Sequence, residues 1–94
     1  MTTIVRQATV AIADGIHARP SHALVSLAVE FDASVRLCFD GRNADSKSIL
    51  SVMTLGAPFG SMIELRGEGV DAEEAVDAIA NFIEDTSNKA PNGN

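Results

Sequence analysis

One histidine in this sequence lies where its ring could accept a phosphoryl group. His17 stands between a turn signal at Asp14-Gly15 and a helix-like run that begins at Ala18, so it falls at or beside a helix N-cap. Free backbone N–H groups and the positive end of the helix dipole converge there, which suits an anion. A neutral imidazole nitrogen beside such a pocket can attack phosphorus. His17 is therefore a candidate site for a phosphohistidine.

Two neighbours of His17 fit the same chemistry. Arg19 supplies a forked set of donors for phosphate oxygens. A cation in the first helical turn opposes the dipole, and a residue that breaks a local rule often marks a site. We therefore assign Arg19 to phosphate, or to acidic groups of a partner. Pro20 costs no hydrogen bond in that turn and fixes the helix start. On the residues alone, His17 could also be a solvated cap residue and Arg19 a solvent-facing charge.

The remaining reactive side chains do not form a cluster. His22 is five residues from His17, which misses the spacing of one helix face, and no carboxylate or thiol group joins the pair. The single cysteine, Cys38, cannot form an internal disulfide, and we assign it no redox role. We expect no metal and no organic cofactor in this chain.

Composition narrows the class of protein. The chain has 94 residues, enough for one small domain, and 46% of them are hydrophobic. The formal net charge of −6 argues against a nucleic-acid partner, which requires a basic surface. The sequence has no apolar run of membrane-spanning length and no signal-peptide pattern at its start. We expect a monomer in the cytoplasm, without insertion into a membrane.

Hydrophobic periodicity predicts seven elements, in the order strand, helix, strand, strand, helix, strand, helix. The ranges are 4–12, 18–31, 35–39, 42–45, about 48–54, 61–66 and a final helix that follows Asp71. Val25 and Val29 widen the apolar stripe of the first helix, which we expect to be deeply packed. This order suits an α+β two-layer domain with helices on one face of a sheet. We assign residues 1–85 to that domain and 86–94 to a flexible polar tail.

Local signals predict how two of the helices begin. Ser46 or Ser48 can cap the short middle helix. Asp71 followed by Glu74 resembles a capping box for the last helix.

Two segments carry a resemblance to a known family. Gly15-Ile16-His17-Ala18-Arg19-Pro20 resembles the active-site segment of HPr, the histidine-containing phosphocarrier family of the bacterial phosphoenolpyruvate-dependent sugar phosphotransferase system. The stretch from Lys47 to Gly56 resembles a second segment of that family, in the same order and separation. The resemblance covers roughly residues 3–85. Ser21-His22 departs from it, since the family usually has small residues there.

The resemblance implies a fold and an activity. The fold is an open-faced βαββαβα sandwich, whose antiparallel sheet has the order 1-4-2-3 and is covered on one face by three helices. His17 would accept a phosphoryl group, through Nδ1, from phosphorylated enzyme I and pass it to an enzyme IIA domain. Ala18 and Arg19 would bind the phosphate. The chain would be a relay protein and not a stand-alone enzyme.

The resemblance also suggests roles for the middle helix. Ser48 matches the serine that HPr kinase/phosphorylase modifies in some members, although a helix-cap role explains it equally well. Ile49, Leu50 and Met53 match an apolar patch that docks partners, and we include Pro20 in that partner-binding surface. A helix this short cannot bury all three apolar side chains.

Other functions remain open at this point. The chain could serve the nitrogen-related branch of the same system or a regulatory circuit, which the motifs do not distinguish. It could also be a regulator that docks through its apolar helix while His17 stays silent. A metal-dependent hydrolase has almost no support in the sequence.

Overall fold

The predicted order of elements is the one that forms. The computed structural model describes residues 3–13 and 15–85, so the predicted tail lies outside the described residues. The elements are β1 (Thr3–Thr9), α1 (Ala18–Ala28), β2 (Ser34–Phe39), β3 (Arg42–Asp45), α2 (Ile49–Leu55), β4 (Met62–Glu68) and α3 (Ala72–Glu84). None of the described helices is long and apolar enough to cross a membrane.

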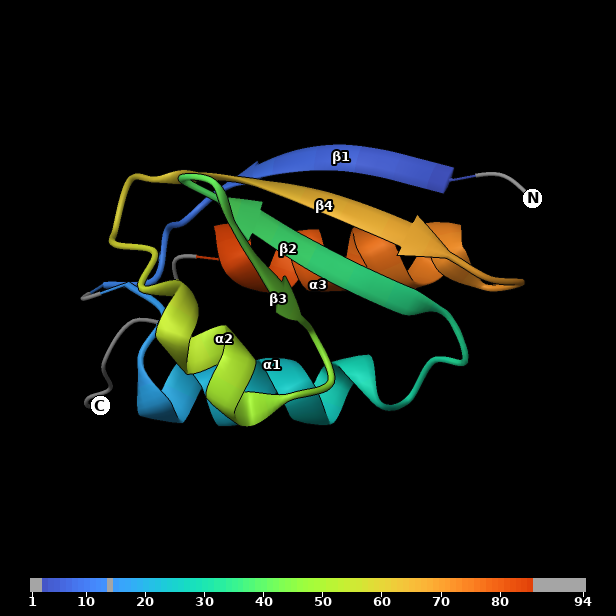
Figure 1. Cartoon of the computed structure of the whole chain (residues 1–94), viewed down its shortest axis with the longest axis horizontal. Helices are drawn as coiled ribbons and strands as arrows, with labels where there is room; N and C mark the ends of the chain where they lie inside the picture. The colour runs from blue at the N-terminus through green and yellow to red at the C-terminus, as the bar shows by residue number, and fades with distance from the viewer. Residues whose placement is uncertain (1–2, 14, 86–94) are drawn as a thin grey trace.

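The four strands form one antiparallel sheet in the order β1-β4-β2-β3, which confirms the predicted topology (Figure 1). β4 is central and pairs along its length with β1, from Thr3 opposite Glu68 to Thr9 opposite Met62. Side chains alternate between the two faces, as strand geometry requires. Val35, Leu37, Ile63 and Leu65 point inward and are buried, while their neighbours along each strand are mostly exposed.

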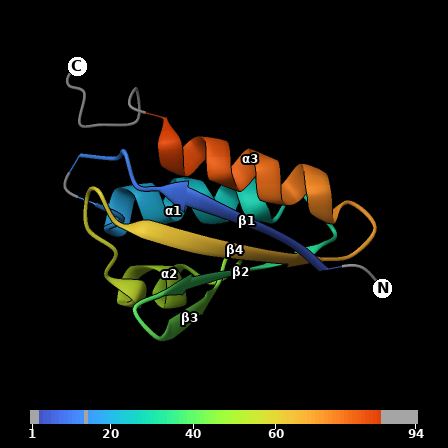
Figure 2. The same ribbon diagram turned by 90° about the horizontal axis from the view of Figure 1, so that it is seen from above.

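The helices pack on the buried face of this sheet, and the other face is open to solvent. α1 contacts both α2 and α3, α3 packs against β1 and β4, and α2 packs against β2 and β3 (Figures 1 and 2). The core is built from aliphatic side chains of every layer; fully buried examples are Leu24, Leu37, Val52, Ile63 and Ile79. An ion pair on the edge of the core joins Arg6 of β1 to Asp77 and Glu84 of α3, at 3.0 and 3.2 Å.

β1 is shorter than predicted, ending at Thr9 and not at Ile12. Val10 and Ile12 are nevertheless buried, so the apolar alternation that suggested a longer strand reflects burial correctly. The N–H of Val10 keeps the register of the ladder, and the backbone then turns away toward α3. The N–H of Val10 donates to the Ser61 carbonyl at 2.8 Å, and that of Ala11 to the Ile83 carbonyl, at the end of α3, at 2.9 Å.

α1 ends three residues before the predicted Phe31. After Ala28 the chain tightens: the N–H of Glu30 donates to the Leu27 carbonyl and that of Phe31 to the Ala28 carbonyl, both at 3.1 Å and three residues back. Val29 lies just before this turn and keeps the helical hydrogen bond from its N–H to the Val25 carbonyl, at 3.0 Å. Val29 is 56% exposed, so the prediction that it is packed was wrong.

β4 continues past the predicted Arg66 to Glu68, because Gly67 keeps its place in the ladder. A glycine is needed there for packing. A Cβ on Gly67 would lie 2.5 Å from the Cγ2 atom of Val76, so its absence lets α3 lie close against the sheet.

The predicted capping box of the last helix was wrong. Asp71 occupies the N-cap position of α3, but its carboxylate makes no cap hydrogen bond. It accepts instead from the backbone N–H groups of Asp32 at 3.0 Å and Ala33 at 2.7 Å. The Asp32 hydrogen bond is the main reason that the pKa of Asp71 lies below its usual value. The Ala33 bond and the charge of Lys47 act in the same direction, and desolvation opposes them. Asp71 therefore ties the turn after α1 to the start of α3.

Candidate functional site

His17 is the N-cap residue of α1, as the sequence predicts. Its backbone is extended (φ −118°, ψ −160°), and its carbonyl accepts the N–H of Ser21 at 2.8 Å, which starts the helix. The imidazole is exposed and makes no cap hydrogen bond. The ring is therefore in solvent at the helix start, neither buried nor engaged in holding the helix together.

The backbone next to His17 has N–H groups that bind no acceptor among the described residues. Ala18 and Arg19 follow the N-cap, and within the described residues no acceptor is bound to the N–H of either one. Pro20 has no N–H to satisfy. Two backbone N–H groups at the positive end of an eleven-residue helix thus lie beside an exposed imidazole. This arrangement can hold the oxygens of a phosphate attached to that ring.

The chain just before His17 is fixed by the loop that follows α2. The N–H of Ile16 donates to the Ala57 carbonyl at 3.0 Å, and the Ile16 side chain is buried. Gly15 has a φ of 78°, and a Cβ there would lie 2.6 Å from the Ala57 carbonyl oxygen and 2.8 Å from Cα of Pro58. Only glycine fits both the dihedral angle and the space. The first segment of the resemblance is thus in direct contact with the loop that follows the second.

The first turn of α1 separates its residues into exposed and buried positions. Arg19 and His22 are exposed, and Arg19 makes no ion pair within the described residues. Pro20 is buried, which supports its role in starting the helix and leaves little of it for a partner to touch. Ser21 is fully buried, so its departure from the family pattern does not reach the surface, whereas that of His22 does. The described residues contain no cluster that could hold a metal ion.

Ser48 is the N-cap residue of α2. Its Oγ accepts the N–H of Ser51 at 3.3 Å, which confirms one of the two predicted caps. Ser46, the other candidate, is fully buried, and its N–H donates to the Val35 carbonyl. Beside Ser48, Lys47 Nζ donates to the Phe31 carbonyl at 2.8 Å and links the start of α2 to the turn after α1.

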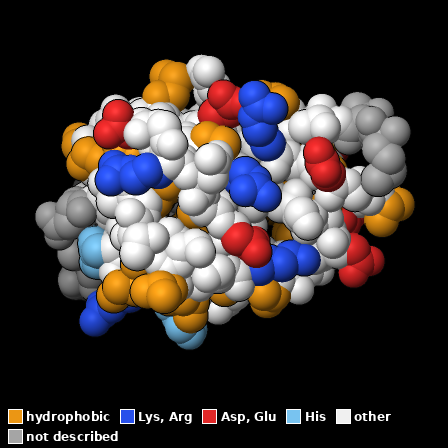
Figure 3. All heavy atoms as spheres, in the orientation of Figure 1, with side chains coloured by type: hydrophobic (Ala, Val, Ile, Leu, Met, Phe, Trp, Pro, Cys, Tyr) orange, Lys and Arg blue, Asp and Glu red, His pale blue; other side chains and the backbone are white. Residues whose placement is uncertain are grey.

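α2 presents an apolar surface to solvent. Ile49, Leu50 and Met53 are 40%, 71% and 40% exposed, while Val52 and Leu55 are buried on its other side. We call the three exposed residues the α2 patch. Figure 3 shows hydrophobic side chains gathered at the lower left, over α2, with the two histidines of the chain on either side of them.

Sequence reasoning missed one apolar residue near this surface. Phe59 lies in the loop after α2 and is 64% exposed. The loop is marked by Gly56, Pro58 and Gly60, but nothing in that pattern indicates whether the Phe59 ring turns inward. The loop is the one that contacts Gly15 and Ile16, so Phe59 extends the apolar surface toward the His17 end of the molecule.

An open antiparallel sheet, three helices on one face and a solvent-exposed histidine at the start of the first helix together define a class of small phosphocarriers. The family model described as the phosphorylation site of the PTS HPr component matches residues 4–85. The chain belongs to this family, and it is an HPr-family phosphocarrier of the phosphotransferase system.

Three relatives illustrate the similarity. The chain is 44% identical over 69 residues to the phosphocarrier protein HPr of Cupriavidus necator, covering 73% of this chain and 78% of that protein. It is 37% identical over 84 residues to the phosphocarrier protein NPr of Shewanella violacea, covering 89% and 92%. The crystal structure of HPr from Bacillus anthracis superposes with a TM-score of 0.85 at 35% identity, covering 88% of this chain and 99% of that one.

Proposed function

We propose that this chain relays phosphoryl groups through His17, from phosphorylated enzyme I to an enzyme IIA domain, in the cytoplasm. The observation that carries the proposal is the exposed ring of His17 beside the N–H groups of Ala18 and Arg19, which have no acceptor among the described residues. Membership of the HPr family supports the choice of donor and acceptor. No metal or organic cofactor takes part.

The transfer is an in-line displacement at phosphorus. The lone pair of Nδ1 forms the new P–N bond while the bond between phosphorus and enzyme I breaks and its electrons return to enzyme I. The other ring nitrogen keeps its proton. The N–H groups of Ala18 and Arg19 receive the phosphate oxygens, and the guanidinium of Arg19 adds a charge-assisted contact. Transfer to the IIA domain is a second displacement of the same kind, in which the P–N bond at His17 breaks.

Partners dock on the α2 patch beside the phosphorylation site. Apolar residues that gather in one exposed patch, unlike single ones, often mark protein–protein contacts. The patch is near His17 because the loop after α2 contacts Gly15 and Ile16. A partner that covers the patch therefore reaches the imidazole with the same surface.

Ser48 is the candidate for regulation by HPr kinase/phosphorylase. A phosphate on its Oγ would add nearly two negative charges directly beside Ile49. The start of α2 tolerates a negative charge, so we expect the helix to persist and partner docking to weaken. Mass spectrometry of protein treated with the kinase and ATP checks this; a peptide containing Ser48 that stays unmodified would exclude the role.

The branch of the system is a separate question. The relatives include both an HPr and an NPr, and both branches use the same histidine chemistry. We propose the sugar branch, with the nitrogen branch or a regulatory HPr-like role as the alternative. Phosphotransfer from the labelled chain to a sugar-type and a nitrogen-type IIA domain, measured side by side, distinguishes the two branches by rate.

The central test compares the two histidines of the chain. With phosphoenolpyruvate and enzyme I, wild-type protein should gain an acid-labile, base-stable phosphate, and phosphorus NMR should identify the ring nitrogen. His17→Ala should abolish incorporation. His22→Ala is the matched control, because His22 is exposed in the first turns of α1, and this variant should retain phosphate incorporation. Incorporation that persists in His17→Ala would refute the relay. If partner binding survives His17→Ala and is lost in Met53→Asp, the docking regulator becomes the better description.

A further inference from the structure

A hollow of about 230 Å³ lies on the open face of the sheet, away from the phosphorylation site. It lies where β4 ends and β1 begins, and in Figure 1 this edge is opposite to the one at which α1 starts. Its polar walls come from four strands: Thr3 from β1, Ser34 and Arg36 from β2, Asp45 from β3, and Arg66 and Glu68 from β4. None of these residues has a part in the proposed relay.

Two arginines of this hollow are direct neighbours across the centre of the sheet. Arg36 of β2 is opposite Arg66 of β4, and both point to the solvent face. Like charges at opposite positions of adjacent strands are destabilising. Glu64 compensates Arg66 through an ion pair with its Nε, but Arg36 has no ion pair or hydrogen bond within the described residues. Among the described residues, Arg36 is therefore the arginine of this pair that remains available to a ligand.

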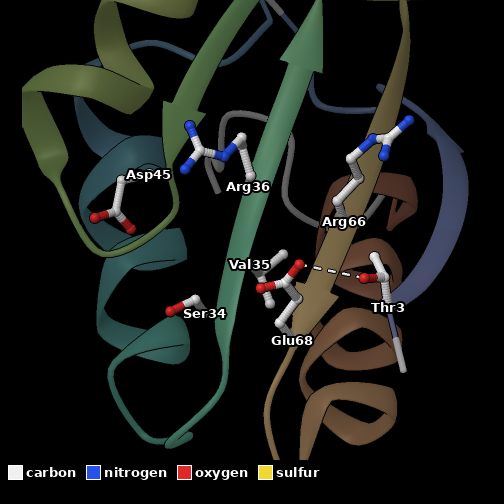
Figure 4. Close-up of a pocket in the computed structure, with 7 residues that line it drawn as sticks. All are labelled: Thr3, Ser34, Val35, Arg36, Asp45, Arg66 and Glu68. Atoms are coloured by element: carbon white, nitrogen blue, oxygen red, sulfur yellow. Dashed lines mark hydrogen bonds between the residues drawn. The ribbon is translucent and has the colours of Figure 1, made fainter. Parts of the chain in front are cut away.

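Two carboxylates complete the hollow, and each is only partly engaged. Asp45, opposite Arg36 on the other side, accepts the N–H of Lys47 at 2.9 Å through Oδ1. Glu68 accepts the Thr3 hydroxyl at 3.2 Å through Oε2. Within the described residues, no hydrogen bond occupies Asp45 Oδ2 or Glu68 Oε1. Figure 4 shows the guanidinium groups of Arg36 and Arg66 turned away from each other, with that of Arg36 on the Asp45 side and the Glu68 carboxylate below both.

This charge distribution selects one class of ligand. The two arginines and two carboxylates cancel, so the hollow has no net charge, and the chain as a whole is at −6. Neither value favours a phosphate or another free anion. A small molecule with a carboxylate at one end and an ammonium group at the other matches both kinds of charge. Guanidinium forks bind carboxylates in a bidentate manner, and an ammonium group donates to carboxylate oxygens.

We propose that this hollow binds a free α-amino acid. The ligand carboxylate lies on Arg36, its ammonium group donates to Glu68 Oε1, and the Ser34 hydroxyl supplies a further donor. The contacts are open to solvent, so the affinity is weak, with a Kd on the order of millimolar. Binding does not depend on His17 and persists whether or not the chain is phosphorylated.

Amide NMR on ¹⁵N-labelled protein, titrated with L-alanine, tests the proposal. The amides of residues 34–36 and 66–68 should shift in a saturable manner, while those of Ala18 and Arg19 should stay in place. Acetate and methylammonium each carry one of the two charges and should bind about tenfold more weakly. Absence of saturable shifts at the hollow, or equal binding of acetate or inorganic phosphate, would overturn the assignment.

Substitutions in the hollow test which side chains bind L-alanine. Arg36→Gln and Glu68→Gln lie on the solvent face, so they should fold, and each should weaken L-alanine binding about tenfold. Arg42→Gln removes the same charge from an exposed site outside the hollow and should bind like wild type. Wild-type affinity in both Arg36→Gln and Glu68→Gln would refute the site. The test is independent of the relay, since failure here leaves phosphate incorporation at His17 untouched.

Discussion

The starts of α1 and α2 solve the same physical problem in opposite ways. Every helix begins with backbone N–H groups that lack a partner. At α2, the Ser48 hydroxyl accepts one of them, from Ser51. At α1, His17 holds the same position without a cap hydrogen bond, and no acceptor in the described part of the chain binds the N–H groups of Ala18 and Arg19. The comparison indicates that the start of α2 is closed by a cap that stabilises the helix. The start of α1 is open: it has no side-chain cap, and its N–H groups can bind an anion.

Converting the open start of α1 into a closed one should have the largest effect. His17→Ser supplies the hydroxyl that α1 lacks, and it should raise the free energy of unfolding by about 0.5 kcal/mol while abolishing phosphate uptake. Urea denaturation and phosphate incorporation from phosphoenolpyruvate measure the two effects. A variant that is both less stable and inactive would show that His17 has a structural role which the exposed ring does not indicate.

Disturbing the support of the open helix start should have the next largest effect. Gly15→Ala forces a Cβ against the Ala57 carbonyl at an unfavourable φ, and it should lower the free energy of unfolding by about 3 kcal/mol. Gly60→Ala is the control: its φ is 87°, but a Cβ there meets nothing within 4 Å. That variant should lose only about 1 kcal/mol. If urea denaturation gives the same loss of unfolding free energy for both variants, the contact with the loop after α2 contributes nothing to stability.

Removing the closed cap should have a smaller effect. Ser48→Ala leaves the Ser51 N–H without its acceptor and should cost about 1 kcal/mol. Ser48→Asp keeps an acceptor at the N-cap and should recover most of the loss. Thermal and urea denaturation of the pair measure it. If Ser48→Asp is as unstable as Ser48→Ala, the hydroxyl matters for a reason other than capping.

The start of α3 offers a third case, with an effect confined to one pH range. Asp71 has a lowered pKa, so its stabilising contribution is present above the pKa of an unfolded aspartate, about 3.9. The contribution disappears as the pH falls through the folded-state pKa. Asp71→Asn keeps one acceptor and should be slightly less stable than wild type near pH 6, with the two converging in acid.

Urea denaturation between neutral and acid pH tests this, with Glu73→Gln as a control that removes a carboxylate from the same helical turn. A difference between Asp71→Asn and wild type that stays constant down to the lowest pH would contradict the assigned hydrogen bonds.

The comparison also explains which features could be predicted from sequence. The cap at Ser48 and the position of His17 depend on residues within one helical turn, so local patterns suffice. Asp71 has the same local signal, but its acceptor oxygens are taken by Asp32 and Ala33, 39 and 38 residues away. Rules based on neighbouring residues cannot predict that such distant N–H groups bind the Asp71 carboxylate in place of the helix cap. The sheet order came from the family resemblance, since the periodicity of the strands does not encode their neighbours.

Other features depended on where the backbone goes. Alternation in the first strand correctly predicted burial of Val10 and Ile12, but not that the Ala11 N–H would donate to α3 and not to a strand. The spacing of Val29 suggested a place in the stripe of α1, but its side chain is exposed although its N–H keeps the helical bond to the Val25 carbonyl. The hollow on the open face was not predicted at all, because Arg36 and Arg66 become neighbours only through the register of β2 and β4.

The hydrogen bond from Ile16 to Ala57 has a consequence for the timing of transfer. Both residues are buried, and the bond joins the peptide unit just before the nucleophile to the loop at the end of the docking helix. The backbone on which the reacting ring is mounted is therefore already held in place before a partner binds. Its alignment needs no adjustment after the encounter, so it adds no step to the transfer.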